Sequence, residues 1–265
     1  MSRMKLGLVL ETLGLPIRSA LQEASRLAVS GVQVDAIGDI APDALTATGR
    51  REFKTLLRSY NLELTALNCP LRRGLDQAEQ LQPRLEHLRK VMQLAFDLEC
   101  RKIIVPLPKI MTDAMSPRAL TMRESLSALA GFGDRMGTRV AVEPGLDDGP
   151  TVRDYLGSYD SGSLAINFDP ANFLVNGYDP ITTLANLGSL IIHTHARDAR
   201  TATVSGGARE VPVGAGDIDW MIYFATMESV EYRGFIVVDR EGGDRRGADV
   251  ASGVQFLRRF IVAGP

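Results

Sequence analysis

The chain is poor in cysteine, histidine and tryptophan, and it contains no long hydrophobic run. Its 265 residues include two cysteines, three histidines and one tryptophan. Cys69 and Cys100 are too few for a disulfide scaffold and lack the spacing of a zinc site, so we expect a protein of the reducing cytoplasm. The apolar run at 6–10 ends at Glu11, far short of the roughly 18 residues of a membrane helix.

Neither sign of charge is in excess. The chain has 30 basic and 32 acidic residues, for a net charge of -2. Proteins that bind nucleic acids usually carry a basic excess, so we expect no nucleic-acid partner, and the short apolar runs predict no membrane partner. A hydrophobic content of 45% is typical of a globular protein, and a chain of this length can bury a core without a disulfide or a structural metal.

Short β-type runs alternate with amphipathic helical stretches along the whole chain. The runs rich in Val, Ile and Leu are 5–10, 32–37, 62–67, 102–107, 139–143, 164–169, 190–195 and 235–239. The clearest helical patterns are 16–29, 83–98, 117–136 and 248–260. This alternation predicts parallel βαβ units, and about eight of them without a break in composition predict an α/β fold with a single (β/α)8 TIM barrel domain over residues 1–265.

A doubly wound open sheet is the alternative architecture. Such a sheet often binds nucleotides through a GxGxxG turn or a P-loop, and the sequence contains neither. The stretch 198–217 has no clear periodicity, and in a barrel it would form a long loop over the mouth, where loops are usually functional.

Four successive predicted strands end in an acid or a histidine. The residues are Glu143, Asp169, His195 and Asp239. Active sites of TIM barrels lie at the carboxyl ends of the strands, so these side chains are expected to meet in the mouth. Each alone is an ordinary cap or turn residue, but together three carboxylates and one imidazole suit Mn²⁺ or Mg²⁺. The pattern therefore predicts one bound divalent metal ion.

Five segments carry a resemblance to a known family. They are VAVEPG at 140–145, INFDPAN at 166–172, HTHARDA at 193–199, GAGDIDW at 214–220 and FIVVDREGG at 235–243. In their order and spacing they resemble the xylose isomerase-like barrel superfamily, which includes ketose 3-epimerases, inosose dehydratases and endonuclease IV. The resemblance implies that Glu143, Asp169, His195 and Asp239 ligate the metal, and that Glu143 and Asp239 are the catalytic acid–base pair.

The sequence departs from the family pattern at two positions. Asn172 stands where a histidine is common, and Asp239 stands where the family usually has glutamate. An amide can bind a sugar hydroxyl but cannot titrate near neutral pH. The three-metal cluster of endonuclease IV needs further histidines, whereas His87 lies in a helical stretch and only the pair at 193 and 195 remains, which disfavours a nuclease.

The resemblance assigns the metal to His195, with His193 one layer deeper. We expect Asp239 to be the ligand at the last strand and Glu241 to be an outer residue paired with a nearby cation. Arg197 could hold an anionic group of a substrate or form an ion pair at the rim. The candidate substrate-binding residues are Asn172, Arg197, His193, Asn68, Glu11 and Trp220.

These features lead to a functional expectation. We predict a metal-dependent sugar or polyol isomerase or epimerase, which removes a proton next to a carbonyl and passes through an enediolate. An inosose-type dehydratase on the same barrel is one alternative, and a non-catalytic sugar-binding barrel is another. The expected partner is a small sugar or polyol, and a homo-oligomer is allowed.

Overall fold

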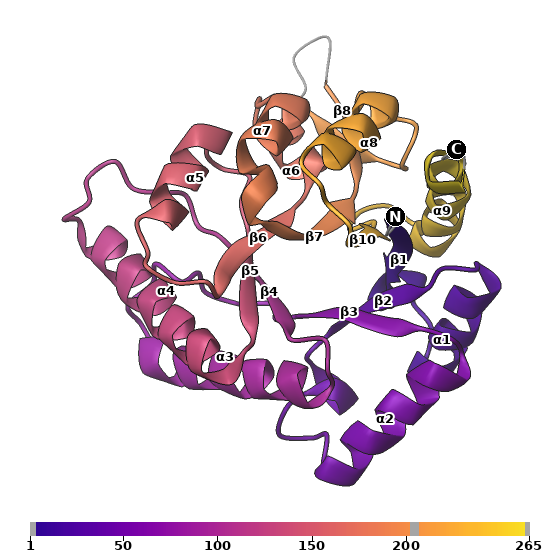
Figure 1. The fold of residues 1–265 in the computed structure, drawn as a ribbon, viewed down its shortest axis with the longest axis horizontal. Coiled ribbons are helices and arrows are strands. Elements are labelled where there is room, and N and C mark those ends of the chain that lie inside the picture. The colour runs from indigo at the N-terminus through magenta and orange to yellow at the C-terminus, as the bar shows by residue number, and fades with distance from the viewer. Residues whose placement is uncertain (1–3, 202–206, 263–265) are drawn as a thin grey trace.

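Eight parallel strands close into a barrel, as the sequence predicts. The computed structural model describes residues 4–201 and 207–262. The barrel strands are β1 (Lys5–Val9), β2 (Gly31–Asp35), β3 (Glu63–Asn68), β4 (Lys102–Pro106), β5 (Arg139–Glu143), β6 (Leu164–Phe168), β7 (Ile191–Ala196) and β10 (Phe235–Val238). Their order around the ring is β1-β10-β7-β6-β5-β4-β3-β2, which confirms the TIM barrel (Figure 1).

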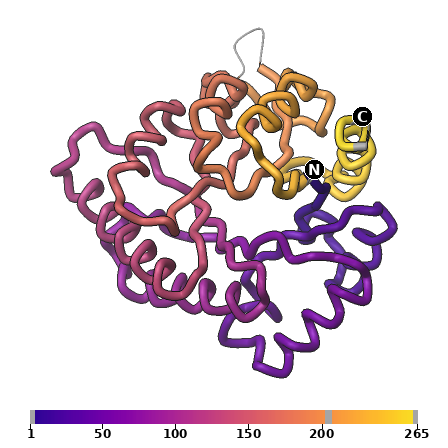
Figure 2. Tube along the Cα trace, viewed as in Figure 1, coloured from indigo at the N-terminus to yellow at the C-terminus, as the bar shows by residue number. Residues whose placement is uncertain are grey.

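Helices form the outer layer of the barrel. They are α1 (Ile17–Arg26), α2 (Ala47–Ser59), α3 (Leu81–Asp97), α4 (Pro117–Met136), α5 (Gly149–Gly157), α6 (Pro170–Val175), α7 (Pro180–Leu187), α8 (Trp220–Ser229) and α9 (Arg246–Val262). The first and last strands pair in parallel from Lys5–Phe235 onward, which places β1 beside β10 (Figure 2). This pairing of β1 with β10 closes the ring.

The strands are apolar on both faces because both faces are buried. Val140 and Val142 of β5 belong to the large core between barrel and helices. Ala141 lies between them and packs inside the barrel with Ala66 and Ile104. Period-two alternation then places Glu143 on the inner face, one step beyond Ala141.

The described parts of the stretch 198–217, residues 198–201 and 207–217, are more ordered than the sequence predicts. Strand β8 (Asp198–Arg200) pairs antiparallel with β9 (Arg209–Val211), and residues 202–206 lie outside the described residues. The buried Asp198 carboxylate holds the chain that follows by accepting hydrogen bonds from Gly214 N, Gly216 N and Trp220 Nε1 at 2.8, 3.2 and 3.0 Å. A Cβ at Gly216 would lie 2.0 Å from the same carboxylate, so this approach requires glycine.

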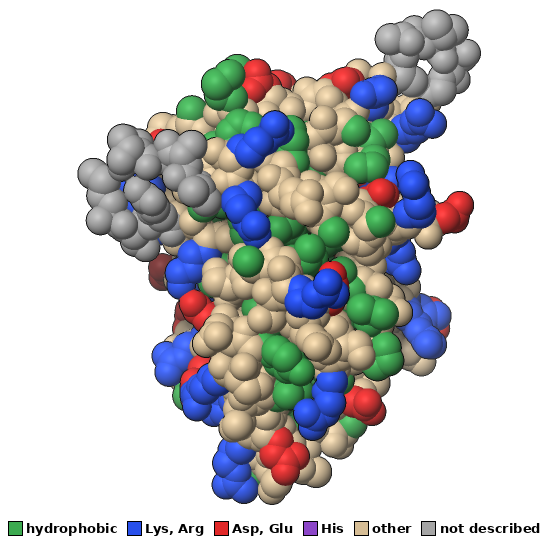
Figure 3. All heavy atoms as spheres, turned by 90° about the vertical axis from the view of Figure 1, so that its right-hand side faces the viewer, with side chains coloured by type: hydrophobic (Ala, Val, Ile, Leu, Met, Phe, Trp, Pro, Cys, Tyr) green, Lys and Arg blue, Asp and Glu red, His purple; other side chains and the backbone are tan. Residues whose placement is uncertain are grey.

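The surface mixes charges of both signs. On the face shown in Figure 3, basic and acidic side chains are scattered among hydrophobic ones. Within the residues that the structure describes, every helix is too short or too polar to cross a lipid bilayer.

Candidate active site

Three of the four expected metal ligands come together at the carboxyl ends of β5, β6 and β7. Ligand atoms of Glu143, Asp169 and His195 lie within 4.8 Å of one another. His195 Nδ1 is 3.1 Å from Glu143 Oε2 and 3.7 Å from Asp169 Oδ2. Donors bound to one ion at about 2.0–2.6 Å have separations of this size, and two carboxylates with one imidazole suit a hard divalent cation. The three residues therefore form a candidate metal-binding triad.

His195 is held with Nδ1 toward the carboxylates. Its other nitrogen, Nε2, lies 2.7 Å from Oε1 of the buried Gln33 on β2. An amide oxygen at this position favours a proton on Nε2 and leaves Nδ1 as the ligand atom. Burial of the imidazole lowers its pKa, but Glu143 and Asp169 outweigh that effect and raise the pKa to about 10. The site therefore attracts positive charge at the position where a cation would bind.

Two amides orient Glu143. Asn172 Nδ2 donates a hydrogen bond of 2.9 Å to Oε1, and Asn167 Nδ2 donates to Oε2. Asn172 thus contacts the Glu143 carboxylate directly from the start of α6, at the position where the family commonly has histidine.

The carboxylate of Asp169 caps α6. It accepts hydrogen bonds from the N–H groups of Ala171 and Asn172 at 2.9 and 3.2 Å.

Arg197 is enclosed by carboxylates. Its Nη1 lies 3.0 Å from Asp169 Oδ2, its Nε 3.1 Å from Glu210 Oε1, and its Nη2 3.0 Å from Glu241 Oε2. Nη1 also donates to Asn172 Oδ1 at 3.2 Å. Of the two roles considered for Arg197, this geometry favours the ion pair, and Glu241 is the outer residue paired with a cation, as expected.

Glu11, Asp35 and Asn68 face the triad across the mouth. In the ring of strands, β1, β2 and β3 stand opposite β5, β6 and β7. Asn68 Nδ2 donates to Asp35 Oδ1 at 2.8 Å, and Asp35 N–H donates to Glu11 Oε1 at 2.8 Å. Glu11 is exposed as a residue, but desolvation of its carboxyl group and the neighbouring Asp35 carboxylate raise its pKa to about 7.

A cavity of about 370 Å³ connects the two sides of the mouth. Glu11, Asn68, Glu143, His195 and Asp239 all line it. Asp239 lies outside the group of three close ligand atoms. Its Oδ1 accepts hydrogen bonds from Thr12 Oγ1 at 2.8 Å and from Arg240 N–H at 2.7 Å, so this carboxylate is fixed at the mouth beside the triad.

Two of the candidate substrate-binding residues, His193 and Trp220, are buried away from the cavity, and His193 occupies the deeper layer expected for it. His193 is fully buried one layer below His195, where its ring nitrogens lie 2.8 Å from Asn167 Oδ1 and 3.1 Å from Thr65 Oγ1. Burial keeps its pKa well below the ordinary value. For Trp220, the sequence allows either an apolar wall of the site or a core residue; the structure buries its indole against Tyr223 and bonds it to Asp198, so it packs in the core.

Sequence reasoning did not single out several residues that orient the site. Thr12, Gln33 and Asn167 each contact an expected ligand or acid–base group, and Glu210 contacts Arg197. A signal was present for Gln33 and Asn167, which are polar residues inside otherwise apolar strands. Buried polar side chains need partners, and here the partners are the site residues.

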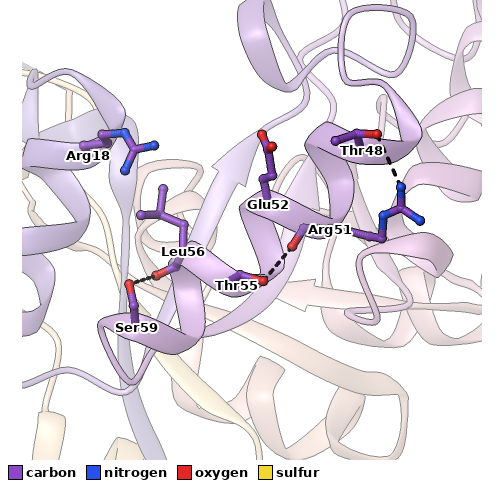
Figure 4. A pocket seen from close by; sticks show the side chains of 7 residues that line it. All are labelled: Arg18, Thr48, Arg51, Glu52, Thr55, Leu56 and Ser59. Carbon is purple, nitrogen blue, oxygen red and sulfur yellow. Dashed lines mark hydrogen bonds between the residues drawn. The ribbon is translucent and has the colours of Figure 1, made fainter.

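A second hollow lies between α1 and α2 on the outside of the barrel (Figure 4). Its polar side chains are paired locally along α2: Thr55 Oγ1 donates to Arg51 O at 3.0 Å, and Ser59 Oγ donates to Leu56 O at 2.7 Å. The hollow therefore shows no convergent chemistry like that of the barrel mouth.

Comparison with solved structures shows the same fold over the whole chain. A xylose isomerase domain protein from Planctomyces limnophilus superposes with a TM-score of 0.86 at 22% identity, covering 99% of this chain and 100% of that chain. A D-tagatose 3-epimerase-like protein gives a TM-score of 0.77 at 16% identity, with 98% of each chain covered. The probable 3-DHS dehydratase AsbF from Bacillus anthracis gives 0.77 at 18% identity, covering 96% of this chain and 99% of that one.

Sequence comparison agrees with the fold. The uncharacterized protein YfiH from Bacillus subtilis (strain 168) is 27% identical, with 90% of this chain and 93% of that protein covered. The model of the family described as xylose isomerase-like TIM barrel matches residues 21–260. The chain therefore belongs to the xylose isomerase-like TIM barrel family.

Proposed function

We propose that this protein is a divalent-metal-dependent isomerase or epimerase of a sugar or polyol. The observation that carries the proposal is the triad of Glu143, Asp169 and His195 at the edge of a cavity of about 370 Å³. Relatives by fold whose names describe sugar epimerases support the reaction class. A cavity of this volume fits a small polyhydroxylated substrate.

The chemistry requires stabilisation of negative charge next to a carbon acid. A bound Mn²⁺ or Mg²⁺ would supply that stabilisation to neighbouring carbonyl and hydroxyl oxygens of the substrate. Glu143, Asp169 and His195 would hold the ion, and we propose Asp239 as the fourth ligand. Thr12 and the Arg240 N–H hold Oδ1 of Asp239 at the mouth, beside the triad.

Glu143 and Asp239 would move the proton. Both carboxylates line the cavity, Glu143 from β5 and Asp239 from the end of β10. One would remove the proton beside the carbonyl and the other would return it on the opposite face, which inverts the centre. Asn172 and Asn167 orient Glu143 by hydrogen bonds, and positioned groups of this kind contribute to the rate of proton transfer.

The remaining polar side chains of the mouth would bind hydroxyl groups. Asn68 and Glu11 offer an amide and a carboxyl group on the side opposite the triad. Arg197 is saturated by carboxylates, so we assign it the role of holding Asp169 and Asn172 rather than contacting the substrate.

The proposal is tested by metal analysis followed by proton exchange. The purified protein is assayed for bound Mn²⁺, Mg²⁺ and related ions, and is then incubated in D₂O with a panel of ketoses, ketose phosphates and inososes. We expect deuterium wash-in next to the carbonyl of one substrate class, lost after metal removal and in Glu143→Gln. Bound substrate without exchange would instead support a sugar-binding barrel.

A dehydratase is the second candidate, because one relative by fold is a probable dehydratase. It would begin with the same proton abstraction but expel a hydroxyl group from the neighbouring carbon. The same incubation separates the two, since a dehydratase releases water and forms an unsaturated product, whereas an epimerase conserves the formula of its substrate.

A further inference from the structure

The carboxylate of Glu210 contacts two separate segments at the mouth of the barrel. Glu210 lies on β9, and its side chain is 14% exposed. Its Oε1 lies 3.1 Å from Arg197 Nε and accepts the Glu241 N–H at 3.0 Å. Its Oε2 lies 3.0 Å from Arg240 Nη1 and accepts the Gly242 N–H at 2.8 Å. Each oxygen is therefore shared between one arginine and one backbone amide.

Three of these contacts are hydrogen bonds, donated by Arg197 Nε, the Glu241 N–H and the Gly242 N–H, and the fourth is an ion pair with Arg240 Nη1. Glu210 does not line the cavity of about 370 Å³. Its contacts join the β8–β9 hairpin to the segment that follows β10, two parts of the chain separated by α8. Charge-assisted hydrogen bonds of this kind are the strong ones, and Glu210 makes them while mostly buried.

The segment after β10 depends on such contacts. Strand β10 ends at Val238, and the Asp239 N–H still donates to Ala196 O of β7 at 3.3 Å, so residues 240–243 are outside the ladder of the barrel. Gly242 and Gly243 follow, and Gly243 has a φ of +95°. Glycine loses more conformational freedom on ordering than any other residue. The segment therefore needs fixed partners, and Glu210 supplies the acceptors for two consecutive amides in it.

Asp239 is at the start of this segment. The Arg240 N–H donates to Asp239 Oδ1, and the Arg240 side chain is held by Glu210 and by Asp249 of α9. Without the Glu210 carboxylate, the Arg240 side chain would pair with Asp249 alone. The backbone N–H groups of Glu241 and Gly242 would lose the oxygens that accept their hydrogen bonds. The backbone that orients the Asp239 carboxylate would then be free to move.

We propose that Glu210 is a positioning residue, which fixes the segment 239–242 and Arg197 around the mouth without contacting the substrate. Its effect on turnover rests on the proposed function, whereas its effect on the order of the segment does not. The positioning role of Glu210 and the proposed function can therefore be tested separately.

The test compares Glu210→Ala and Glu210→Gln with Glu99→Gln. Glu99 also pairs with two cations, Lys54 and Arg58, but on the outer surface. The first measurement is amide hydrogen exchange of the full-length protein. We expect exchange at Glu241 and Gly242 to accelerate about tenfold or more in Glu210→Ala, less in Glu210→Gln, and not at all in Glu99→Gln. Amides of β4 should be unchanged in all three and report the global stability.

The second measurement is turnover of the substrate found in the D₂O panel. We expect kcat to fall about tenfold or more in Glu210→Ala with KM changed less than threefold, because an acid–base group is displaced rather than a binding contact removed. Unchanged exchange at 241 and 242, or equal acceleration in β4, would overturn the proposal. Accelerated exchange in a protein whose wild type turns over no sugar would uphold the positioning role and reject the proposed function.

Discussion

Arg197 Nη1 lies 3.0 Å from Oδ2 of Asp169, a member of the candidate metal triad, and both side chains are buried. Burial disfavours the charged carboxylate, but Arg197 and His195 outweigh it and lower the pKa of Asp169 below its ordinary value. Asp169 is therefore ionised at neutral pH. The same guanidinium also pairs with Glu210 and Glu241, so carboxylates of the protein itself balance its positive charge.

Replacing Arg197 should strongly destabilise the metal-free protein. Arg197→Met would leave the Asp169 carboxylate buried without its guanidinium and Glu210 with Arg240 alone, and breaking a buried pair costs about 3–5 kcal/mol. Urea denaturation measures the loss. Arg26→Met is the control, because Arg26 is 74% exposed in its ion pair with Glu23 and should change stability by less than about 1 kcal/mol. Equal effects of the two substitutions would contradict the role given to Arg197.

The two histidines of the β7 strand should respond differently to substitution. His195→Ala should reduce Mn²⁺ affinity at least about 100-fold, since it removes a ligand of the triad. His193→Ala should retain Mn²⁺ binding but lose stability, because Asn167 and Thr65 lose buried partners at about 1–3 kcal/mol each. Titration with Mn²⁺ and urea denaturation measure the two effects. If His193→Ala abolished binding while His195→Ala kept it, the assignment would be reversed.

Asp239 and Glu241 provide a matched pair of carboxylates. Both line the cavity, but Asp239 is 8% exposed, whereas the Glu241 side chain is 64% exposed and pairs with Arg197. We expect Asp239→Asn to reduce deuterium wash-in at least about 100-fold, in the range of general acid–base catalysis. Glu241→Gln should reduce it less than tenfold. Loss of exchange in Glu241→Gln alone would move the second acid–base role to Glu241.

Glu11 should make stability depend on pH. Its pKa is about 7 in the folded protein, whereas the ordinary value for a glutamate is 4.5. The folded state therefore holds a proton that the unfolded state releases, so stability falls as pH rises from about 4.5 through 7. Glu11→Gln should remove this loss and be more stable than the wild type above pH 7, by up to about 1 kcal/mol because the residue is partly solvated.

Urea denaturation at pH 5 and pH 8 measures the difference between Glu11→Gln and the wild type. Glu52→Gln on α2 is the control, and its difference from the wild type should be the same at both pH values. A Glu11→Gln difference that did not grow with pH would show that the carboxyl group is ionised throughout.

Local patterns determined the fold. Runs of Val, Ile and Leu at 102–107 and 139–143 predicted β4 and β5 within one residue, because a strand buried on both faces must be apolar throughout. The range 117–136 was predicted for α4 and agrees with the structure, since Ser116 caps its start, Pro117 occupies its first turn and Gly137 ends it in the left-handed conformation. These signals act over neighbouring residues and are readable without tertiary contacts.

The sequence also indicated which strand ends bear the chemistry. Glu143, Asp169 and His195 each follow an apolar run, and parallel strands of a barrel place such ends at one mouth. The convergence of their ligand atoms within 4.8 Å follows from that rule together with period-two alternation.

Only the tertiary structure decided how these side chains are held. Glu210 accepts a hydrogen bond from the backbone amide of Glu241, which is 31 residues away along the sequence. Gln33 is 162 residues away from His195, with which it forms a hydrogen bond. From the sequence alone Trp220 could line the pocket or pack in the core, and its contacts with Asp198 and Tyr223 place it in the core. Hydrogen bonds and ion pairs between distant strand ends depend on the closure of the barrel, which no local pattern encodes.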